Sequence, residues 1–157
     1  AELSGFGAAY DRHWTAGMRA KLGLASTVPD DEVAALAGRL LGLMAEHRLD
    51  FTGTFRGLAR AARGGPAALA DPELAEWATD WLRHVPEADP MDRVNAVYIP
   101  RNHLVDEALV AANEGDLSLF TQLLDAVSYP FEERPDRRRF ALPAPLELPP
   151  HRTYCGT

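Results

Sequence analysis

The chain has 157 residues and a net charge of −7, with 46% hydrophobic and 25% charged residues. This length suits one domain with a real core, and the balance of residue types excludes a chain disordered throughout. The negative charge argues against nucleic acid as a general partner, because a phosphate-binding surface needs surplus positive charge. The 26 alanines and 21 leucines favour helices over strands.

Seven helices are predicted from apolar residues that recur every three or four positions. They are expected at about 3–22, 31–48, 51–63, 72–85, 90–95, 101–114 and 117–127. The first helix should bury a single face that carries Leu3, Phe6, Tyr10, Trp14 and Met18. The sequence therefore predicts an all-α fold, with about seven helices packed in an irregular bundle.

Aspartates and glycines mark the expected helix ends. Asp is a preferred N-cap, and we expect caps at Asp30, Asp50, Asp71, Asp89 and Asp116. Two of these, Asp71 and Asp89, precede a proline at the first helical position, where proline is favoured. Glycine is common after a helix C-terminus, which predicts helix ends at Gly23 and Gly115.

The composition changes at Tyr129, because half of the twelve prolines lie between this residue and Thr157. We expect a helical domain over 1–128 and an extended Pro-rich tail over 129–157, since proline disfavours helix interiors and central strands. Such a tail could lie across the helical body, or it could stay disordered until a partner binds. Its candidate buried residues are Phe131, Phe140, Leu142 and Leu146.

Arg101, Asn102 and His103 form the most prominent polar group, directly after Pro100 and at an expected helix start. Free backbone N–H groups at such a start attract anions, so the trio could contact a phosphate or a carboxylate of another domain. The alternative is structural: Asn102 caps the helix, and Arg101 pairs with a buried acidic group.

Other candidate sites are less well supported by the sequence. The histidines lack the spacing of a metal site, and no glycine-rich phosphate loop is present, so we expect neither a metal nor a nucleotide site. Trp77 and Trp81 share a helical face that is typical of core packing. The run from Arg137 to Arg139 could bind an anion or remain solvated. Cys155 is either an idle thiol or a reactive one, and Arg152 would favour its thiolate.

The order of several short segments, and the ending of the chain, resembles the C-terminal part of the selenoprotein O / YdiU family. The most specific segments are Tyr98-Ile-Pro-Arg-Asn-His103 and Thr153-Tyr-Cys-Gly-Thr157. The others are Lys21-Leu-Gly-Leu24, Asp50-Phe-Thr52, Phe55-Arg56, Glu114-Gly-Asp116 and Tyr129-Pro130. This chain departs from the family pattern at Ala96, His151 and Tyr154, which affects the local turns only.

This resemblance implies a protein adenylyltransferase, in which a kinase-like region binds ATP and Mg²⁺ and transfers AMP to Ser, Thr or Tyr of protein substrates. Nothing in this chain matches the nucleotide and metal ligands of that region, so no catalytic residue is assigned here. The resemblance also implies a redox role for Cys155. Its partners would be the kinase-like part of the same protein, and a second thiol outside this chain, because Cys155 is the only cysteine.

Three further expectations concern the location of the protein, its completeness and its rival functions. No apolar run approaches the roughly 20 residues that span a bilayer, and no signal peptide is recognised, so we expect a cytoplasmic bacterial protein without a membrane partner. The start at Ala1, close to an apolar helical stripe, favours a piece of a longer protein.

The rival hypotheses are an independent helical interaction module that binds through the Trp77/Trp81 face or the tail, and a small thiol enzyme that uses Cys155 and His151.

Overall fold

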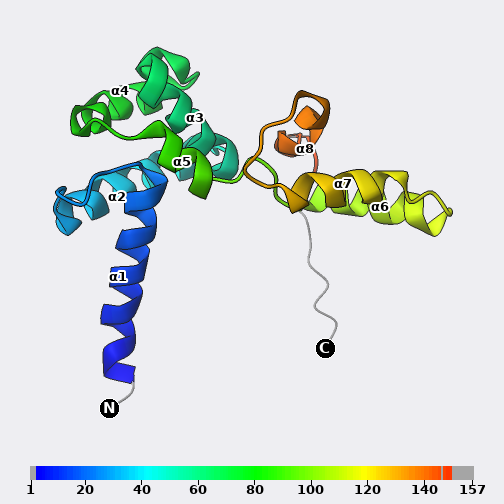
Figure 1. The fold of residues 1–157 in the computed structure, drawn as a ribbon, viewed down its shortest axis with the longest axis horizontal. Helices are drawn as coiled ribbons and strands as arrows, with labels where there is room; N and C mark the ends of the chain where they lie inside the picture. Colours follow the sequence, from blue (N-terminus) through cyan, green and yellow to red (C-terminus); the bar gives the residue numbers. More distant parts are fainter. Residues whose placement is uncertain (1–2, 146, 150–157) are drawn as a thin grey trace. The chain divides into compact units, whose positions relative to one another are not determined.

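The structure is a computed structural model that describes residues 3–145 and 147–149. These residues contain eight α-helices, three short 3₁₀ turns and no strand, which confirms the all-α prediction for them (Figure 1). The chain divides into two compact units, residues 1–96 (unit 1) and 97–157 (unit 2). Each unit has its own hydrophobic core, and each is described here by itself.

Unit 1 contains the first five helices. Their bounds are α1 (Leu3–Lys21), α2 (Asp30–Glu46), α3 (Phe51–Gly64), α4 (Pro72–Trp81) and α5 (Ala88–Val94). The 3₁₀ turns Pro66–Ala68 and Leu82–His84 follow α3 and α4. Helix α3 packs on α5, α2 packs on α4, and α1 contacts both α2 and α5. Sequential short connections therefore bring five amphipathic helices around one core.

Local sequence determines several of these helix ends as predicted. Asp50 caps α3 by accepting a hydrogen bond from the Gly53 N–H at 2.6 Å. Asp71 caps α4 by accepting one from the Leu74 N–H at 2.9 Å, and Pro72 occupies the first helical position. Gly23 follows α1 with φ of +65°, a conformation that favours glycine.

Two predicted caps are wrong because ion pairs engage these aspartates instead. Asp30 is already the first residue of α2, and its carboxylate pairs with the Arg19 guanidinium at 2.5 Å. Asp89 lies inside α5, which begins at Ala88, and it pairs with Arg63 of α3 at 2.6 Å. Tertiary partners thus outweigh the local capping preference at both positions.

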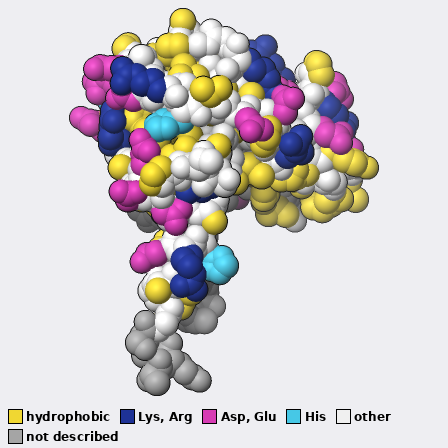
Figure 2. Space-filling model, turned by 60° about the vertical axis from the view of Figure 1, so that its left-hand side comes forward, with side chains coloured by type: hydrophobic (Ala, Val, Ile, Leu, Met, Phe, Trp, Pro, Cys, Tyr) yellow, Lys and Arg dark blue, Asp and Glu magenta, His cyan; other side chains and the backbone are white. Residues whose placement is uncertain are grey.

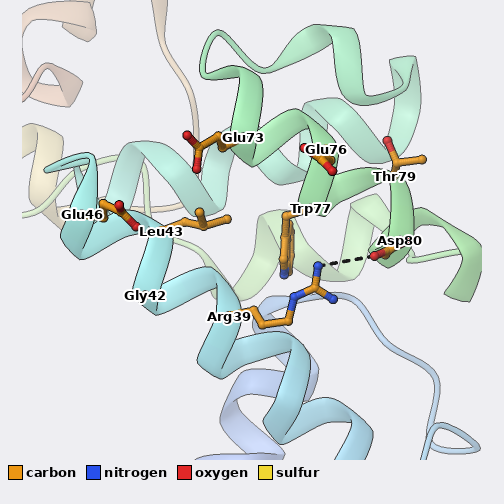
Figure 3. A pocket seen from close by; sticks show the side chains of 9 residues that line it. All are labelled: Arg39, Gly42, Leu43, Glu46, Glu73, Glu76, Trp77, Thr79 and Asp80. Atoms are coloured by element: carbon orange, nitrogen blue, oxygen red, sulfur yellow. Dashed lines mark hydrogen bonds and ion pairs between the residues drawn. The ribbon is translucent and has the colours of Figure 1, made fainter.

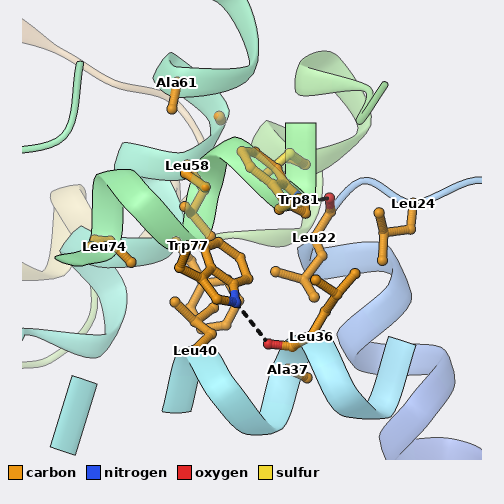
Figure 4. Close-up of a cluster of buried hydrophobic side chains, with 14 of the residues drawn as sticks. Leu22, Leu24, Leu36, Ala37, Leu40, Leu58, Ala61, Leu74, Trp77 and Trp81 are labelled. Atoms are coloured by element: carbon orange, nitrogen blue, oxygen red, sulfur yellow. Dashed lines mark hydrogen bonds between the residues drawn. The ribbon is translucent and has the colours of Figure 1, made fainter. Parts of the chain in front are cut away.

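The tryptophans form the centre of the unit 1 core (Figure 4). Trp77 and Trp81 stack with ring centroids 5.8 Å apart. Their indole N–H groups donate to the Leu36 and Leu22 carbonyls at 3.2 and 2.9 Å, respectively. Both rings are at most 2% exposed, which confirms the core-packing interpretation. A partner cannot bind to this buried face, so that form of the interaction-module hypothesis is wrong.

The apolar stripe of α1 is only half covered. Trp14 and Met18 pack against the unit 1 core, as predicted. Phe6 and Tyr10, farther toward the start of the helix, are 70% and 57% exposed, so their predicted burial is wrong. The first turns of α1 extend beyond the other helices of unit 1 (Figure 1).

A buried amide joins the end of α1 to the end of α5. Asn95, which is 1% exposed, donates from Nδ2 to the Lys21 carbonyl at 2.9 Å. Lys21 in turn donates from Nζ to Asn95 Oδ1 at 3.2 Å, and its ammonium lies 5.2 Å from the centre of the Phe55 ring. Partial burial lowers the pKa of Lys21. The pair ties together segments that are 74 residues apart.

Unit 2 is built on a helical hairpin of α6 (Asn102–Asn113) and α7 (Ser118–Ser128) (Figure 1). Gly115, with φ of +89°, ends α6, and Asp116 accepts a hydrogen bond from the Ser118 N–H at 2.8 Å. The glycine agrees with the sequence prediction, whereas the N-cap position of α7 is Leu117 and not the predicted Asp116. A 3₁₀ turn at Pro135–Arg137 and α8 (Arg138–Ala141) follow the hairpin.

The predicted extended tail is wrong for residues 135–141, which are helical. Pro135 occupies the first position of the 3₁₀ turn, where no backbone N–H is needed, and no proline lies between it and Pro143. Phe140 is buried, as predicted, whereas Phe131 and Leu142 are about half exposed, contrary to prediction. Leu146 and the ending from His151 to Thr157 lie outside the described residues.

Candidate functional site

The most specific sequence segment, 98–103, forms a tight turn that leads into α6. The Arg101 N–H donates to the Ile99 carbonyl at 2.8 Å, which closes a three-residue turn around Pro100. The Arg101 carbonyl then accepts hydrogen bonds from the Leu104 and Val105 N–H groups, both at 3.0 Å. The segment thus acts as a rigid corner at the start of the hairpin.

Arg101 is only 8% exposed, and its guanidinium points to another backbone segment of unit 2. Its Nη2 donates to the Ala141 carbonyl at 3.0 Å and so holds the end of α8 to the start of α6. Asn102 is the first residue of α6, and the N-cap position is Arg101, whose side chain forms no capping hydrogen bond. The alternative in which Asn102 caps the helix is therefore wrong.

The predicted polar trio does not share one environment. Arg101 is buried, His103 is half-buried and Asn102 is exposed. Arg101 thus contributes to the internal structure of unit 2, whereas Asn102 and His103 remain accessible at the first turn of a 12-residue helix. Contact of this turn with an anion or with another domain stays a prediction.

Tyr98 is a positioning residue that the sequence pattern did not reveal. Its ring is 1% exposed, and its hydroxyl donates to the Arg134 carbonyl at 3.1 Å and accepts from the Arg134 N–H at 2.8 Å. The Val97 N–H donates to the Pro130 carbonyl at 2.6 Å. The available signal was a tyrosine beside a proline turn, since a buried tyrosine hydroxyl usually finds a partner.

The arginine run 137–139 is neither a free anion site nor a wholly solvated stretch. Arg137 pairs with Asp125 of α7 at 2.9 Å, and Arg139 pairs with Glu107 of α6 at 2.6 Å. Arg134 also pairs with Asp125, at 3.1 Å. The hydrogen bonds from Arg137 and Arg134 hold the pKa of Asp125 below its usual value. These ion pairs fasten the 130–141 segment onto the hairpin.

Unit 1 carries an open groove of about 710 Å³ between α2 and α4 (Figure 3). Arg39 reaches toward Asp80 on the opposite wall and pairs with it at 3.4 Å, and Trp77 lies between these walls (Figure 3). The lining contains four carboxylates and one cation, so its field repels a triphosphate. The lining residues are Arg39, Gly42, Leu43, Glu46, Glu73, Glu76, Trp77, Thr79 and Asp80.

The described residues offer neither a metal site nor a membrane span. No three His, Cys, Asp or Glu side chains among residues 3–145 and 147–149 are grouped so that they could hold a metal ion. Within the same part of the chain, no helix combines the length and the apolar character needed to cross a membrane.

Comparison with known proteins gives the family. No family model matches the chain. A protein nucleotidyltransferase YdiU of Mycolicibacterium paratuberculosis is 47% identical over 157 aligned residues, which cover 94% of this chain and 32% of the relative. The YdiU proteins of Mycolicibacterium smegmatis and Cereibacter sphaeroides are 46% and 49% identical and cover 100% and 99% of this chain.

The chain belongs to the YdiU family, since relatives of this name match 94–100% of it. It spans about a third of the length of the curated YdiU relatives that it matches. The resemblance inferred from segments such as Tyr98–His103 is thereby confirmed at the level of the family. Cys155, the predicted redox residue, lies outside the described residues, and its role stays a prediction.

Proposed function

We propose that this chain is the helical, non-catalytic part of a YdiU-type protein adenylyltransferase, and that it supports the region that binds ATP and Mg²⁺. That enzyme transfers AMP from ATP to Ser, Thr or Tyr hydroxyls of proteins. One observation carries the proposal: relatives named protein nucleotidyltransferase YdiU align over 92–100% of this chain, while the chain matches only about a third of their length.

The chemistry of the described residues supports a structural role. Nucleotidyl transfer requires cations that neutralise the triphosphate, usually metal ions with Lys or Arg. The groove of unit 1 is acidic, the half-buried Arg56 pairs with Asp92 at 2.8 Å, and the buried guanidinium of Arg101 donates to a backbone carbonyl. The nucleotide and metal ligands would therefore come from the other two-thirds of a YdiU protein.

Exposed aromatic rings in unit 1 also fit a supporting role. Phe6 and Tyr10 lie near each other on α1, with ring centroids 6.5 Å apart, and both are more than half exposed. Grouped exposed apolar side chains often mark a surface that another protein segment covers. In the proposed enzyme, the catalytic region of the same polypeptide provides that segment.

Transfer of label from ATP to protein tests whether the nucleotide site lies outside residues 1–157. Residues 1–157 and the full-length protein are each incubated with ATP labelled on the α-phosphate, Mg²⁺ and a protein acceptor. We expect label on protein only with the full-length enzyme, because only it contains the nucleotide site. Label transferred by residues 1–157 alone would refute the proposal.

We further propose that Cys155 is redox-active and forms a disulfide with a thiol outside this chain. The chain has one cysteine, so the second sulfur must lie elsewhere. Oxidised glutathione can accept the two electrons and two protons that leave the thiols, and it becomes two reduced glutathione molecules. Peptide mapping of the oxidised full-length protein without reductant should show a peptide linked through Cys155. A map without this link contradicts the role, and Cys155→Ser is the control.

A further inference from the structure

The two sides of the α6–α7 hairpin differ sharply in what covers them. On one side, Glu107 and Asp125 hold the 130–141 segment through ion pairs with Arg139 and Arg137. Beneath that segment, Ala126 of α7 is fully buried. This side is therefore part of the unit 2 core and already has its neighbour within the chain.

The other side carries a stripe of exposed apolar residues. Along α7, Leu117, Phe120 and Leu124 recur at spacings of three and four residues and are 59%, 46% and 51% exposed. Successive residues of a helix are rotated by about 100°, so this stripe lies roughly a quarter turn around the α7 axis from the buried Leu123. On α6, Leu109 is 53% exposed and lies, in the same rotational sense, about 100° from the buried Ala108 and about 140° from the buried Leu104.

These residues form one continuous face, because α6 and α7 run antiparallel and pack on each other. In an antiparallel pair, each helix can be followed around its own axis from the line where the two helices touch. Turning in the same rotational sense on both helices leads to the same side of the hairpin. Hydrophobic side chains gather along this part of unit 2 in the space-filling view (Figure 2). We call this surface the hairpin face; it consists of Leu109, Leu117, Phe120 and Leu124, with the partly buried Val105 and Val127 at its inner edge.

The four exposed residues that define the hairpin face are all apolar, and the exposed Asp106 lies one turn before Leu109 on α6. An apolar surface of this kind is expected to be covered by another apolar surface. About two-thirds of the length of the YdiU relatives lies outside the matched part, so a large segment of the same polypeptide is available to cover it. An attached segment also has a high effective concentration, which favours it over a second molecule.

We propose that the hairpin face is the docking surface for the catalytic region of the same polypeptide. This inference rests on the proposed function and adds the specific contact surface. An apolar, uncharged face of that region would lie against Phe120 and Leu124, on the side of the hairpin opposite the 130–141 segment. Docking there leaves the Tyr98–Arg101 corner and its hydrogen bonds intact.

Alkylation of an introduced thiol tests the docking in the full-length protein. Leu124→Cys is placed in a Cys155→Ser background from which the other reactive cysteines have been removed, and the rate of modification by a maleimide is followed. The matched control is Val110→Cys, since Val110 lies on another side of α6 and is 62% exposed. We expect Cys at 124 to react at least about tenfold more slowly than Cys at 110, because reaction must await local opening.

Equal rates at the two positions would overturn the docking. Protection at 124 that disappears on dilution, together with a change of oligomeric state, would assign the face to a second copy and also overturn it. The label-transfer assay on the unmodified full-length protein reports separately on the proposed function. An active enzyme with equal alkylation rates contradicts only the docking, whereas an inactive one with protection at 124 contradicts only the activity.

Discussion

The hydroxyl of Tyr98 exchanges two hydrogen bonds with the backbone of Arg134, accepting from its N–H at 2.8 Å and donating to its carbonyl at 3.1 Å. A single side chain thereby satisfies both backbone groups of a residue in the segment that follows α7. Since Tyr98 also stands at the entrance to α6, it fixes the Pro-rich segment to the beginning of the hairpin. Arg101 supplies the second attachment, at Ala141.

Tyr98→Phe should loosen the 130–141 segment without unfolding the hairpin. The substitution leaves the Arg134 N–H and carbonyl without their partner, which costs about 1–3 kcal/mol. Hydrogen exchange at the Arg134 amide should become at least about tenfold faster. Tyr129→Phe is the control, because the Tyr129 ring is about half exposed. Unchanged exchange at Arg134 would show that the hydroxyl does not hold this segment.

Gly23→Ala should destabilise unit 1 by about 2–5 kcal/mol, because two penalties combine. Gly23 has φ of +65°, and an added Cβ would lie 2.8 Å from the Glu87 carbonyl oxygen and 2.7 Å from Met91 Cγ. Gly65→Ala is the control: φ is +84°, but nothing lies within 4 Å of an added Cβ, so only about 1–2 kcal/mol is expected.

Urea unfolding followed by tryptophan fluorescence measures both glycine variants, because the three tryptophans all lie in unit 1. Equal losses of unfolding free energy in the two variants would mean that the close approach of Glu87 and Met91 to Gly23 adds nothing to the cost of Gly23→Ala.

His47 and Asp71 should make the stability of unit 1 depend on pH. Their side chains are 2.6 Å apart, and the hydrogen bond to Asp71 raises the pKa of His47 above its ordinary value of 6.5. The folded state therefore binds a proton more tightly than the unfolded state. This stabilisation is complete below about pH 6.5 and is lost as the pH rises through the raised pKa of folded His47.

Asp71 contributes a second dependence at lower pH. The Leu74 N–H, then His47, lower its pKa below 3.8, so its contribution is present above that pH and is lost as the pH falls through the lowered value. His47→Gln should therefore cost more stability near about pH 5.5 than near about pH 9, as measured by urea unfolding. His13→Gln, at an exposed position of α1, is the control. An equal cost of His47→Gln at both pH values contradicts the ion pair.

Much of the helix layout followed from local sequence. Asp50, Asp71 and Gly23 lie where capping chemistry predicts, because a helix end leaves backbone groups that only a few residue types satisfy. The Trp77/Trp81 stripe was also predicted correctly as core, since its spacing matches one helical face.

Other features depended on contacts that no local pattern encodes. Asp89 was expected to cap α5, but Arg63 of α3 engages it. Phe6 was expected in the core, but it is 70% exposed. The roles of Tyr98 and Arg101 were missed because their partners, Arg134 and Ala141, lie 36 and 40 residues away.

Calorimetric titration of ATP with Mg²⁺ into residues 1–157 tests directly whether the nucleotide site lies outside this chain. The full-length protein, under the same conditions, is the positive control. We predict saturable binding by the full-length protein and none by residues 1–157, because the triphosphate and metal ligands belong to the rest of the polypeptide. Saturable binding of ATP by residues 1–157 would contradict the supporting role proposed for this chain.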